Sequence, residues 1–269
     1  MQTIHTANRR PIPILVYHQI APAPPRGSPC RGLYVDPKAF ARQMAWLKVW
    51  GYTGLSMSGL EPYLRGERTG KVVGITFDDG YQNNLTNALP ALSKHGFSST
   101  CYAVSGLLGK TNEWDESVGI AQTALMNKAE IRQWVAAGQE IGAHTRQHLN
   151  LVAIDDASCR SEIGLGKTEL ESVTGQPVRH FCYPYGRYAA KHVTMVGDFG
   201  FTTATTTQRS RCHAQTDLLQ LPRIGIVRST SLPVFWLNLS KMATVYEAAA
   251  RVAKLSIRVA SAQGFSDRK

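Results

Sequence analysis

The sequence has no long hydrophobic run and no block of like charges. Hydrophobic residues make up 43% of the 269 residues and charged residues 18%, which is typical of a globular protein and excludes a disordered chain. No apolar stretch approaches the roughly 20 residues that a membrane-spanning helix needs. The basic residues before Pro11 are not followed by the apolar core of a secretion signal. We therefore expect a cytoplasmic protein.

Paired cysteines and an excess of acidic residues are also absent. The 19 aspartates and glutamates face 30 lysines and arginines, which gives a net charge of +11. This balance indicates an anionic partner or surface, or no more than solubility. No nucleic-acid-binding motif accompanies it, so nucleic acid is not an expected partner. The cysteines are odd in number and widely spaced, which fits a reducing compartment and no cysteine metal site: Cys30, Cys101, Cys159, Cys182 and Cys212.

The first motif is a β-branched strand that ends in two adjacent carboxylates. Residues 72–77 read as a buried strand, and Asp78, Asp79 and Gly80 follow it. Because side chains alternate along a strand, the two carboxylates can share a site only if the strand ends there, and Gly80 supplies the turn. One carboxylate could then hold a cation while its neighbour takes a proton. On its own, this triplet is also a common turn sequence.

A second strand, beginning at Glu140, leads to His144 and His148. Two imidazoles four residues apart share one face of a helical turn, which is a suitable spacing for gripping one metal ion. With Asp79 they would make a site of two histidines and one carboxylate, with open positions for water and substrate. A lone pair of this kind is more often an ordinary surface pair, but here it follows a strand as the aspartates do.

Short strands alternate with helices along most of the chain, which predicts βαβ units and a mostly parallel sheet. About seven or eight such units fit a barrel better than an open sheet. In a barrel the carboxyl ends of the strands meet at one rim, and the candidate residues would gather there. The predicted strands are 14–17, 51–55, 72–77, 97–104, 178–183, 201–206 and 221–227, with one more from Glu140; the predicted helices are 38–50, 84–95, 128–137, 154–174 and one before Gly200.

These motifs together resemble those of the polysaccharide deacetylases, the NodB-like homology group of carbohydrate esterases (family four). The likeness rests on residues 76–80, on His144-Thr145-x-x-His148 and on the turn at residues 183–186, and it extends from Ile14 to Ile226. It implies a single-domain, distorted (β/α) barrel of about seven strands in residues 11–230. It also implies a divalent metal, most often Zn²⁺ with Co²⁺ or Ni²⁺ as alternatives, and hydrolysis of N-acetyl, less often O-acetyl, groups on sugars.

The resemblance assigns roles to residues that match the family motifs. Asp79, His144 and His148 match the metal ligands, Asp78 matches the general base, and the backbone N–H of Tyr185 matches the oxyanion donor. Sugar sites usually contain aromatic platforms. The residues expected to contact the substrate are therefore Tyr81, Trp114, Pro184 and Tyr185.

Two departures from the family pattern matter. Cys182 stands where members usually carry an arginine, and Arg223 stands in place of a late histidine that protonates the leaving amine. His18 follows the first strand, as in the circularly permuted subgroup that deacetylates poly-N-acetylglucosamine-type exopolysaccharides, and we expect it to be the general acid rather than a structural histidine. Arg223 could orient Asp78 in place of the missing arginine, or it could be a surface cation.

The segment from Lys241 to Gln263 has a helical spacing of apolar residues and several cations. We predict that residues 231–269 form a C-terminal amphipathic helical extension. It either packs on the barrel or docks on an anionic membrane surface, which would make the protein peripheral to the inner membrane face.

The sequence thus predicts a metal-dependent hydrolase that removes N-acetyl groups from N-acetylhexosamine-containing polysaccharide, or from its precursor, in bacterial exopolysaccharide metabolism. An acetylated glycan is the expected partner, and no oligomeric state is predicted. Two alternatives stay open: a catalytically silent carbohydrate-binding barrel, and a metal-dependent amidase acting on a non-sugar C–N bond. The base Asp78 beside the metal ligands argues against a silent binder.

Overall fold

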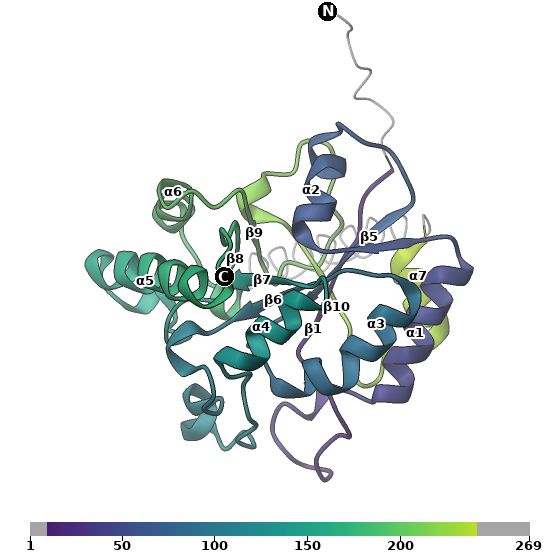
Figure 1. The fold of residues 1–269 in the computed structure, drawn as a ribbon, viewed down its shortest axis with the longest axis horizontal. Coiled ribbons are helices and arrows are strands. Elements are labelled where there is room, and N and C mark those ends of the chain that lie inside the picture. Colours follow the sequence, from purple (N-terminus) through teal and green to yellow (C-terminus); the bar gives the residue numbers. More distant parts are fainter. Residues whose placement is uncertain (1–9, 241–269) are drawn as a thin grey trace, which may run out of the picture. The chain divides into compact units, whose positions relative to one another are not determined.

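In the computed structural model, residues 10–240 are described (Figure 1). The chain divides into two compact units, residues 1–229 and residues 230–269. All the described strands lie in the first unit, and the second contains helix α7 (Leu232–Leu239). The amphipathic helix predicted between Lys241 and Gln263 lies outside the described residues. None of the described helices has the length and apolar character needed to cross a membrane.

A curled parallel sheet forms a half-barrel at the centre of the first unit (Figure 1). It confirms the predicted α/β fold, a distorted barrel of about seven strands. The short strand β4 (Thr53–Leu55) pairs with the first half of β5 (Val72–Phe77), and β6 (Thr100–Ala103) pairs with its second half. In order across the sheet, the strands are β10 (Ile224–Gly225), β1 (Ile14–Tyr17), β5 (Val72–Phe77), β6 (Thr100–Ala103), β7 (Glu140–Ala143), β8 (His180–Cys182) and β9 (Thr203–Thr205).

One short segment, residues 221–226, connects the last strand of this order back to β1. Its first N–H, from Leu221, donates to the Ala204 carbonyl of β9 at 2.8 Å. Its last N–H, from Ile226, donates to the Val16 carbonyl of β1 at 2.9 Å. The segment predicted as a strand over residues 221–227 therefore runs between β9 and β1, although only Ile224–Gly225 pairs as a regular strand. Arg223 lies in the middle of this connection.

The helices follow the strands along the chain, as the alternating pattern predicts. The helix predicted over residues 84–95 is a π-helix (Asn84–Ala88) that continues into α3 (Leu89–His95). Helix α2 (Met57–Arg65) was not predicted, because Gly59 and Pro62 are poor helix formers. A separate two-stranded sheet joins β2 (Gln19–Ile20) and β3 (Tyr34–Val35). The α-helices of the first unit are α1 (Pro37–Val49), α2 (Met57–Arg65), α3 (Leu89–His95), α4 (Lys128–Ala136), α5 (Asp156–Thr174) and α6 (Ala190–Asp198).

A polar cluster at the amino ends of the strands fixes the start of α2. The first backbone N–H groups of α2 donate to side chains of the barrel: that of Met57 to Thr100 at 2.8 Å, and that of Ser58 to Glu140 at 3.2 Å. The Ser58 hydroxyl also contacts Glu140 and lies 2.8 Å from His180 Nε2. These partners satisfy donors that a helix start leaves free. We call Ser58, Thr100, Glu140 and His180 the basal cluster.

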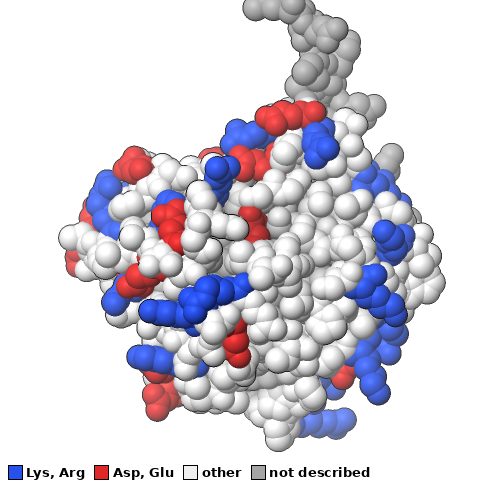
Figure 2. Space-filling view, in the orientation of Figure 1, with Lys and Arg blue, Asp and Glu red and all other residues white. Residues whose placement is uncertain are grey.

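The charged side chains are spread over the molecule. Figure 2 shows lysines and arginines at several places on one face, with acidic side chains interspersed among them on the side of α5. This distribution agrees with the scattered cations of the sequence, and it gives no single basic patch on the face shown.

Candidate active site and metal centre

The two aspartates that follow β5 point to different partners. The Asp78 N–H still donates to the Tyr17 carbonyl of β1 at 3.0 Å, so Asp78 continues the strand. Asp79 adopts a left-handed conformation with φ of 73°, and Gly80 follows with φ of 81°. The turn predicted at Gly80 thus begins one residue earlier. This change of direction sends the two buried carboxylates to neighbouring but separate places.

His144 and His148 both reach Asp79. The Nε2 atoms of the two imidazoles lie 3.5 Å from the same oxygen, Asp79 Oδ1. The prediction that they share a helical turn is wrong, because Thr145 and His148 have φ of 61° and 59° and the segment is an irregular loop. The Thr145 hydroxyl accepts the N–H of His148 at 3.0 Å and closes the loop. The spacing therefore works through a tight loop rather than a helix.

Glu162 of α5 holds that loop from outside and was not predicted as a site residue. Its Oε2 accepts the backbone N–H groups of Arg146 at 3.0 Å and Gln147 at 2.8 Å. Gly166, one helical turn later, packs so closely that a Cβ there would lie 3.0 Å from the Thr145 carbonyl carbon. One signal could have revealed that α5 supports the histidine loop. It is a buried glutamate, Glu162, four residues before a glycine on the helix that follows the loop.

The donor set of Asp79, His144 and His148 fits a divalent metal. Two ligands at about 2.1 Å from a tetrahedral ion are roughly 3.4 Å apart, close to the separations found here. His144 Nδ1 donates to the Cys182 carbonyl at 2.8 Å, which leaves the lone pair of its Nε2 free. Burial lowers the pKa of His148 to about 3, so this imidazole is neutral at pH 7, as a metal ligand must be.

Arg223 forms the most extensive contact with Asp78. Its Nη1 and Nη2 donate to the two carboxylate oxygens, each at 2.7 Å, and its Nε donates to the Thr206 carbonyl at 3.0 Å. The guanidinium is buried, with 1% of the residue exposed. Burial raises the pKa of Asp78, but the charge and hydrogen bonds of Arg223 outweigh it and hold the pKa below its usual value. Arg223 is thus not a surface cation.

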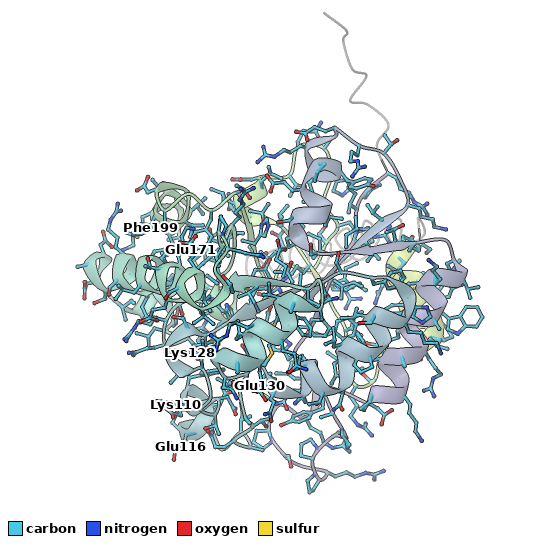
Figure 3. All side chains as sticks on the ribbon, in the orientation of Figure 1. Lys110, Glu116, Lys128, Glu130, Glu171 and Phe199 are labelled. Carbon is cyan, nitrogen blue, oxygen red and sulfur yellow. The ribbon has the colours of Figure 1, made fainter. Side chains whose placement is uncertain are left out.

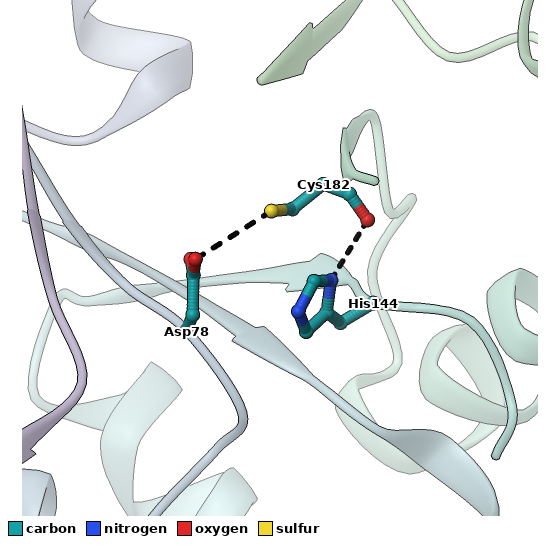
Figure 4. A group of neighbouring side chains, drawn as sticks. All are labelled: Asp78, His144 and Cys182. Carbon is teal, nitrogen blue, oxygen red and sulfur yellow. Dashed lines mark hydrogen bonds between the residues drawn. The ribbon is translucent and has the colours of Figure 1, made fainter. Parts of the chain in front are cut away.

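Cys182 lies between Asp78 and His144 (Figure 4). Its sulfur is 3.7 Å from Asp78 Oδ2 and 3.1 Å from Arg223 Nη2. Asp78, His144 and Cys182 form a second group of metal-ligand types. Because the guanidinium occupies both Asp78 oxygens, this group is a poorer cation site than the one at Asp79. Cys182, at the position where the family usually carries an arginine, is thus in contact with Arg223.

His18 follows β1 at the same rim. Its Nε2 lies 4.0 Å from Asp78 Oδ2, and 26% of its side chain is exposed. The imidazole therefore faces both the buried carboxylate and solvent. The structure brings His18, Asp78 and Arg223 together although they lie far apart in sequence.

Two aromatic rings flank His148. The Trp114 ring stacks on it at 4.4 Å between centroids, and the Tyr185 ring meets it edge-on at 4.6 Å. Trp114 belongs to the rim loop that Lys110 and Glu116 mark in Figure 3. Tyr185 follows the buried Pro184 and has φ of 58°, and 48% of it is exposed. Among the described residues its backbone N–H has no hydrogen-bond partner.

Tyr81 differs from the other predicted substrate contacts. Only 2% of it is exposed, and it packs with Val104, Leu107 and Leu125 beneath Trp114. Burial, followed by the nearby Asp79 carboxylate, raises the pKa of its hydroxyl. The structure therefore places Tyr81 in an apolar cluster under the rim rather than among the exposed groups of the site. The predicted contact of Tyr81 with the substrate stays a prediction, since Asp79 and the two histidines are buried to a similar extent.

Comparison with known proteins identifies the fold and the family. The sequence model of the family described as polysaccharide deacetylase matches residues 65–204, just over half of the chain. YxkH of Bacillus subtilis, a protein named as a polysaccharide deacetylase, is 25% identical over 241 residues, which cover 89% of this chain and 80% of YxkH.

Two solved structures are similar to the chain. The Streptococcus pyogenes deacetylase PplD, in complex with acetate, has a TM-score of 0.76 and 26% identity and covers 87% of this chain and 100% of its own. IcaB from Ammonifex degensii shares the fold, with a TM-score of 0.70 at 22% identity over 86% of this chain and 97% of its own. The chain therefore belongs to the polysaccharide deacetylase family of hydrolases.

Proposed function

We propose that the chain is a metal-dependent deacetylase that removes N-acetyl groups from N-acetylhexosamine units of a polysaccharide or its precursor. The observation that carries this proposal is the pair of adjacent carboxylates with separate partners. Asp79 lies with the two histidines, and Asp78 lies beside them, paired with Arg223. A binding protein has no need of a base next to a metal-ligand set, so this arrangement favours hydrolysis.

Asp79, His144 and His148 would hold the metal, which we propose to be Zn²⁺. When bound, such an ion lowers the pKa of a water molecule and polarises a carbonyl group. The donor set of one carboxylate and two imidazoles suits zinc and leaves positions for water and substrate. The other residues of the site perform the proton transfers.

Asp78 acts as the general base in this proposal. It takes a proton from the water that attacks the acetyl carbonyl carbon. Each carboxylate oxygen keeps a second lone pair after accepting an N–H of Arg223, so the ion pair does not block this transfer. A lowered pKa makes Asp78 a weaker base. Arg223 compensates for this because it fixes the orientation of the carboxylate for proton transfer.

The backbone N–H of Tyr185 stabilises the negative charge that develops on the acetyl oxygen. Tyr185 has a left-handed conformation, and this N–H has no hydrogen-bond partner among the described residues. His18 then protonates the amine as the C–N bond breaks, which releases acetate and a free amino sugar. Trp114 and Tyr185 offer exposed aromatic surface to the sugar ring beside His148.

Acetate release tests the proposal. Enzyme stripped with a chelator is given Zn²⁺, Co²⁺ or Ni²⁺ and incubated with N-acetylglucosamine oligomers, with O-acetylated xylan oligomers and with simple non-sugar acetamides. We expect metal-dependent release that is fastest from the N-acetylglucosamine oligomers. Faster release from the acetamides would favour an amidase, and metal binding without release from any substrate would favour a silent binder.

A further inference from the structure

We propose that Asn83 and Asn87, here called the asparagine pair, position His18 for proton transfer to the leaving amine. This inference rests on the proposed function, in which His18 is the acid. The asparagine pair does not contact the reacting atoms. It holds the backbone that follows His18 in sequence, and it affects the reaction only by setting the position of that imidazole.

The contacts of the pair converge on Ile20, two residues after His18. Asn83 Oδ1 accepts the Ile20 N–H at 2.9 Å, and Asn87 Nδ2 donates to the Ile20 carbonyl at 2.7 Å. Asn83 Nδ2 also donates to the side chain of Gln19 at 3.0 Å. Ile20 is fully buried, so without the two amides its backbone groups would be unpaired away from water.

The neighbouring strand cannot replace these bonds. β2 pairs with β3 through the residues on either side of Ile20, as in the bond from the Ala21 N–H to the Val35 carbonyl at 3.0 Å. In a parallel ladder alternate residues direct their N–H and C=O groups to opposite edges. The groups of Ile20 therefore face away from β3, and the asparagine pair acts as a substitute strand on that edge.

The backbone before His18 is held by the same stretch of chain. The Tyr17 carbonyl accepts the N–H of Asp78 at 3.0 Å, and the asparagine pair follows Asp78 within ten residues. His18 is thus fixed on both sides by the segment that carries the base. Its Nε2 lies 4.0 Å from Asp78 Oδ2 as a result. One continuous segment, residues 78–87, therefore sets the position of the acid relative to the base.

The helix that carries the pair has features that its own stability does not require. Asparagine is a weak helix former, yet Asn83 caps this helix and Asn84 and Asn87 lie in its first turn. Residues Asn84–Ala88 form a π-helix, which is rare and occurs mainly at functional sites. The arrangement is explained if the helix start is shaped to reach β2.

The chemistry requires such positioning. An amine is a poor leaving group, so cleavage of an amide depends on protonation of the nitrogen, and a general acid contributes about 10²- to 10⁴-fold. A displacement of about 1 Å can cost roughly 10²-fold. An activated aryl acetate needs no acid because its phenolate leaves unaided. The asparagine pair should therefore affect amide hydrolysis and spare aryl ester hydrolysis.

The test compares the two substrate types in Asn83→Ala and Asn87→Ala. With N-acetylglucosamine oligomers, we expect kcat/KM to fall about 10- to 100-fold. With p-nitrophenyl acetate, we expect a change of less than twofold. In a His18→Ala background, Asn83→Ala should lower the amide rate by less than a further twofold, because the residue it acts through is gone. Asn127→Ala, which removes the N-cap of α4 and no contact to β2, is the matched control and should leave both rates unchanged.

Equal losses on both substrates, or an undiminished effect of Asn83→Ala without His18, would overturn the positioning role. Protection of the Ile20 amide from hydrogen exchange and NMR relaxation of the His18 ring give a readout without turnover. We expect both to show greater mobility in Asn83→Ala. If the wild type released no acetate, the proposed function would fail, while an unchanged His18 ring in Asn83→Ala would overturn the positioning role by itself.

Discussion

Asp78 and Asp79 are adjacent in sequence, yet their carboxylates have different surroundings and different proposed roles. Asp79 meets two imidazoles that leave room for a cation, whereas Asp78 is enclosed by a guanidinium on both oxygens. Strand alternation predicted only that the two carboxylates could differ in role, and the resemblance to the family assigned the base to Asp78. The sequence could not decide whether Arg223 orients Asp78 or is a surface cation. The two residues are 145 positions apart, and no local pattern connects residues at that separation.

Replacement of Arg223 by lysine tests the contact with Asp78. A lysine ammonium cannot donate to both carboxylate oxygens in the planar geometry of a guanidinium. We expect Arg223→Lys to lower kcat about 10- to 100-fold with little change in KM, since the base loses its orientation and the substrate contacts remain. Steady-state kinetics measure this. A wild-type kcat in Arg223→Lys would show that the orientation of Asp78 is set by other residues.

At the scale of secondary structure, α5 and the histidine loop form one unit. The two imidazoles were predicted to share a helical face, but the loop between them has left-handed residues that a spacing pattern does not reveal. Such a loop is held by tertiary contacts, here those of Glu162 and Gly166 on α5. The strands of the large sheet and most helices could be predicted from apolar periodicity. Strands β2 and β3, helix α2 and the π-helix could not, because their sequences are too short or favour other structures locally.

Glu162→Gln should weaken metal binding. The amide keeps the shape of the side chain, but the charge-assisted bonds to the N–H groups of Arg146 and Gln147 become weaker. Support groups behind metal ligands typically contribute about 10- to 100-fold in affinity, and we expect a loss in this range for Zn²⁺. Isothermal titration of the stripped protein measures it. Glu169→Gln, on the same helix but paired with the Arg146 side chain, is the control and should bind Zn²⁺ as the wild type does.

Gly166→Ala should destabilise the protein although alanine favours helices. The new Cβ would lie 3.0 Å from the Thr145 carbonyl carbon and 3.2 Å from its oxygen, and backbone cannot yield as a side chain can. Overpacking costs about 1–3 kcal/mol, against a helix gain of about 1 kcal/mol. Urea unfolding should therefore show a lower free energy of unfolding. Gly197→Ala in α6 would meet only a Leu219 methyl at 3.4 Å, so this control should be neutral or stabilising.

At the scale of the whole molecule, the two ends of the barrel have separate tasks. The carboxyl ends of the strands carry the candidate site, and the amino ends carry the basal cluster, which joins α2 to β6, β7 and β8. The alternation of strands and helices predicted this overall plan. The basal cluster was not predicted, because its members are common polar residues that only the closing of the sheet brings together.

The basal cluster should make stability depend on pH. Burial raises the pKa of Glu140, but His180 and the hydroxyls of Ser58 and Thr100 outweigh it and lower the pKa to about 2. Because the folded pKa lies below the ordinary value, the contribution of Glu140 is present at neutral pH. It is lost as the pH falls through the ordinary carboxyl range toward 2. Glu140→Gln should be less stable than the wild type at pH 7, and the difference should shrink between about pH 5 and pH 2. Urea unfolding at several pH values measures it, and a constant difference would exclude this role.

The central claim is that Asp79 and the two histidines hold a metal for which Asp78 supplies the base. The most direct test measures bound Zn²⁺ and released acetate on the same samples of wild type, Asp78→Asn and Asp79→Asn, with N-acetylglucosamine oligomers as substrate. The account predicts that Asp78→Asn binds one Zn²⁺ with at most a modest loss of affinity but releases acetate at least about 100-fold more slowly. Asp79→Asn should lose both. Near-wild-type acetate release by Asp78→Asn, or undiminished Zn²⁺ binding by Asp79→Asn, would contradict the account.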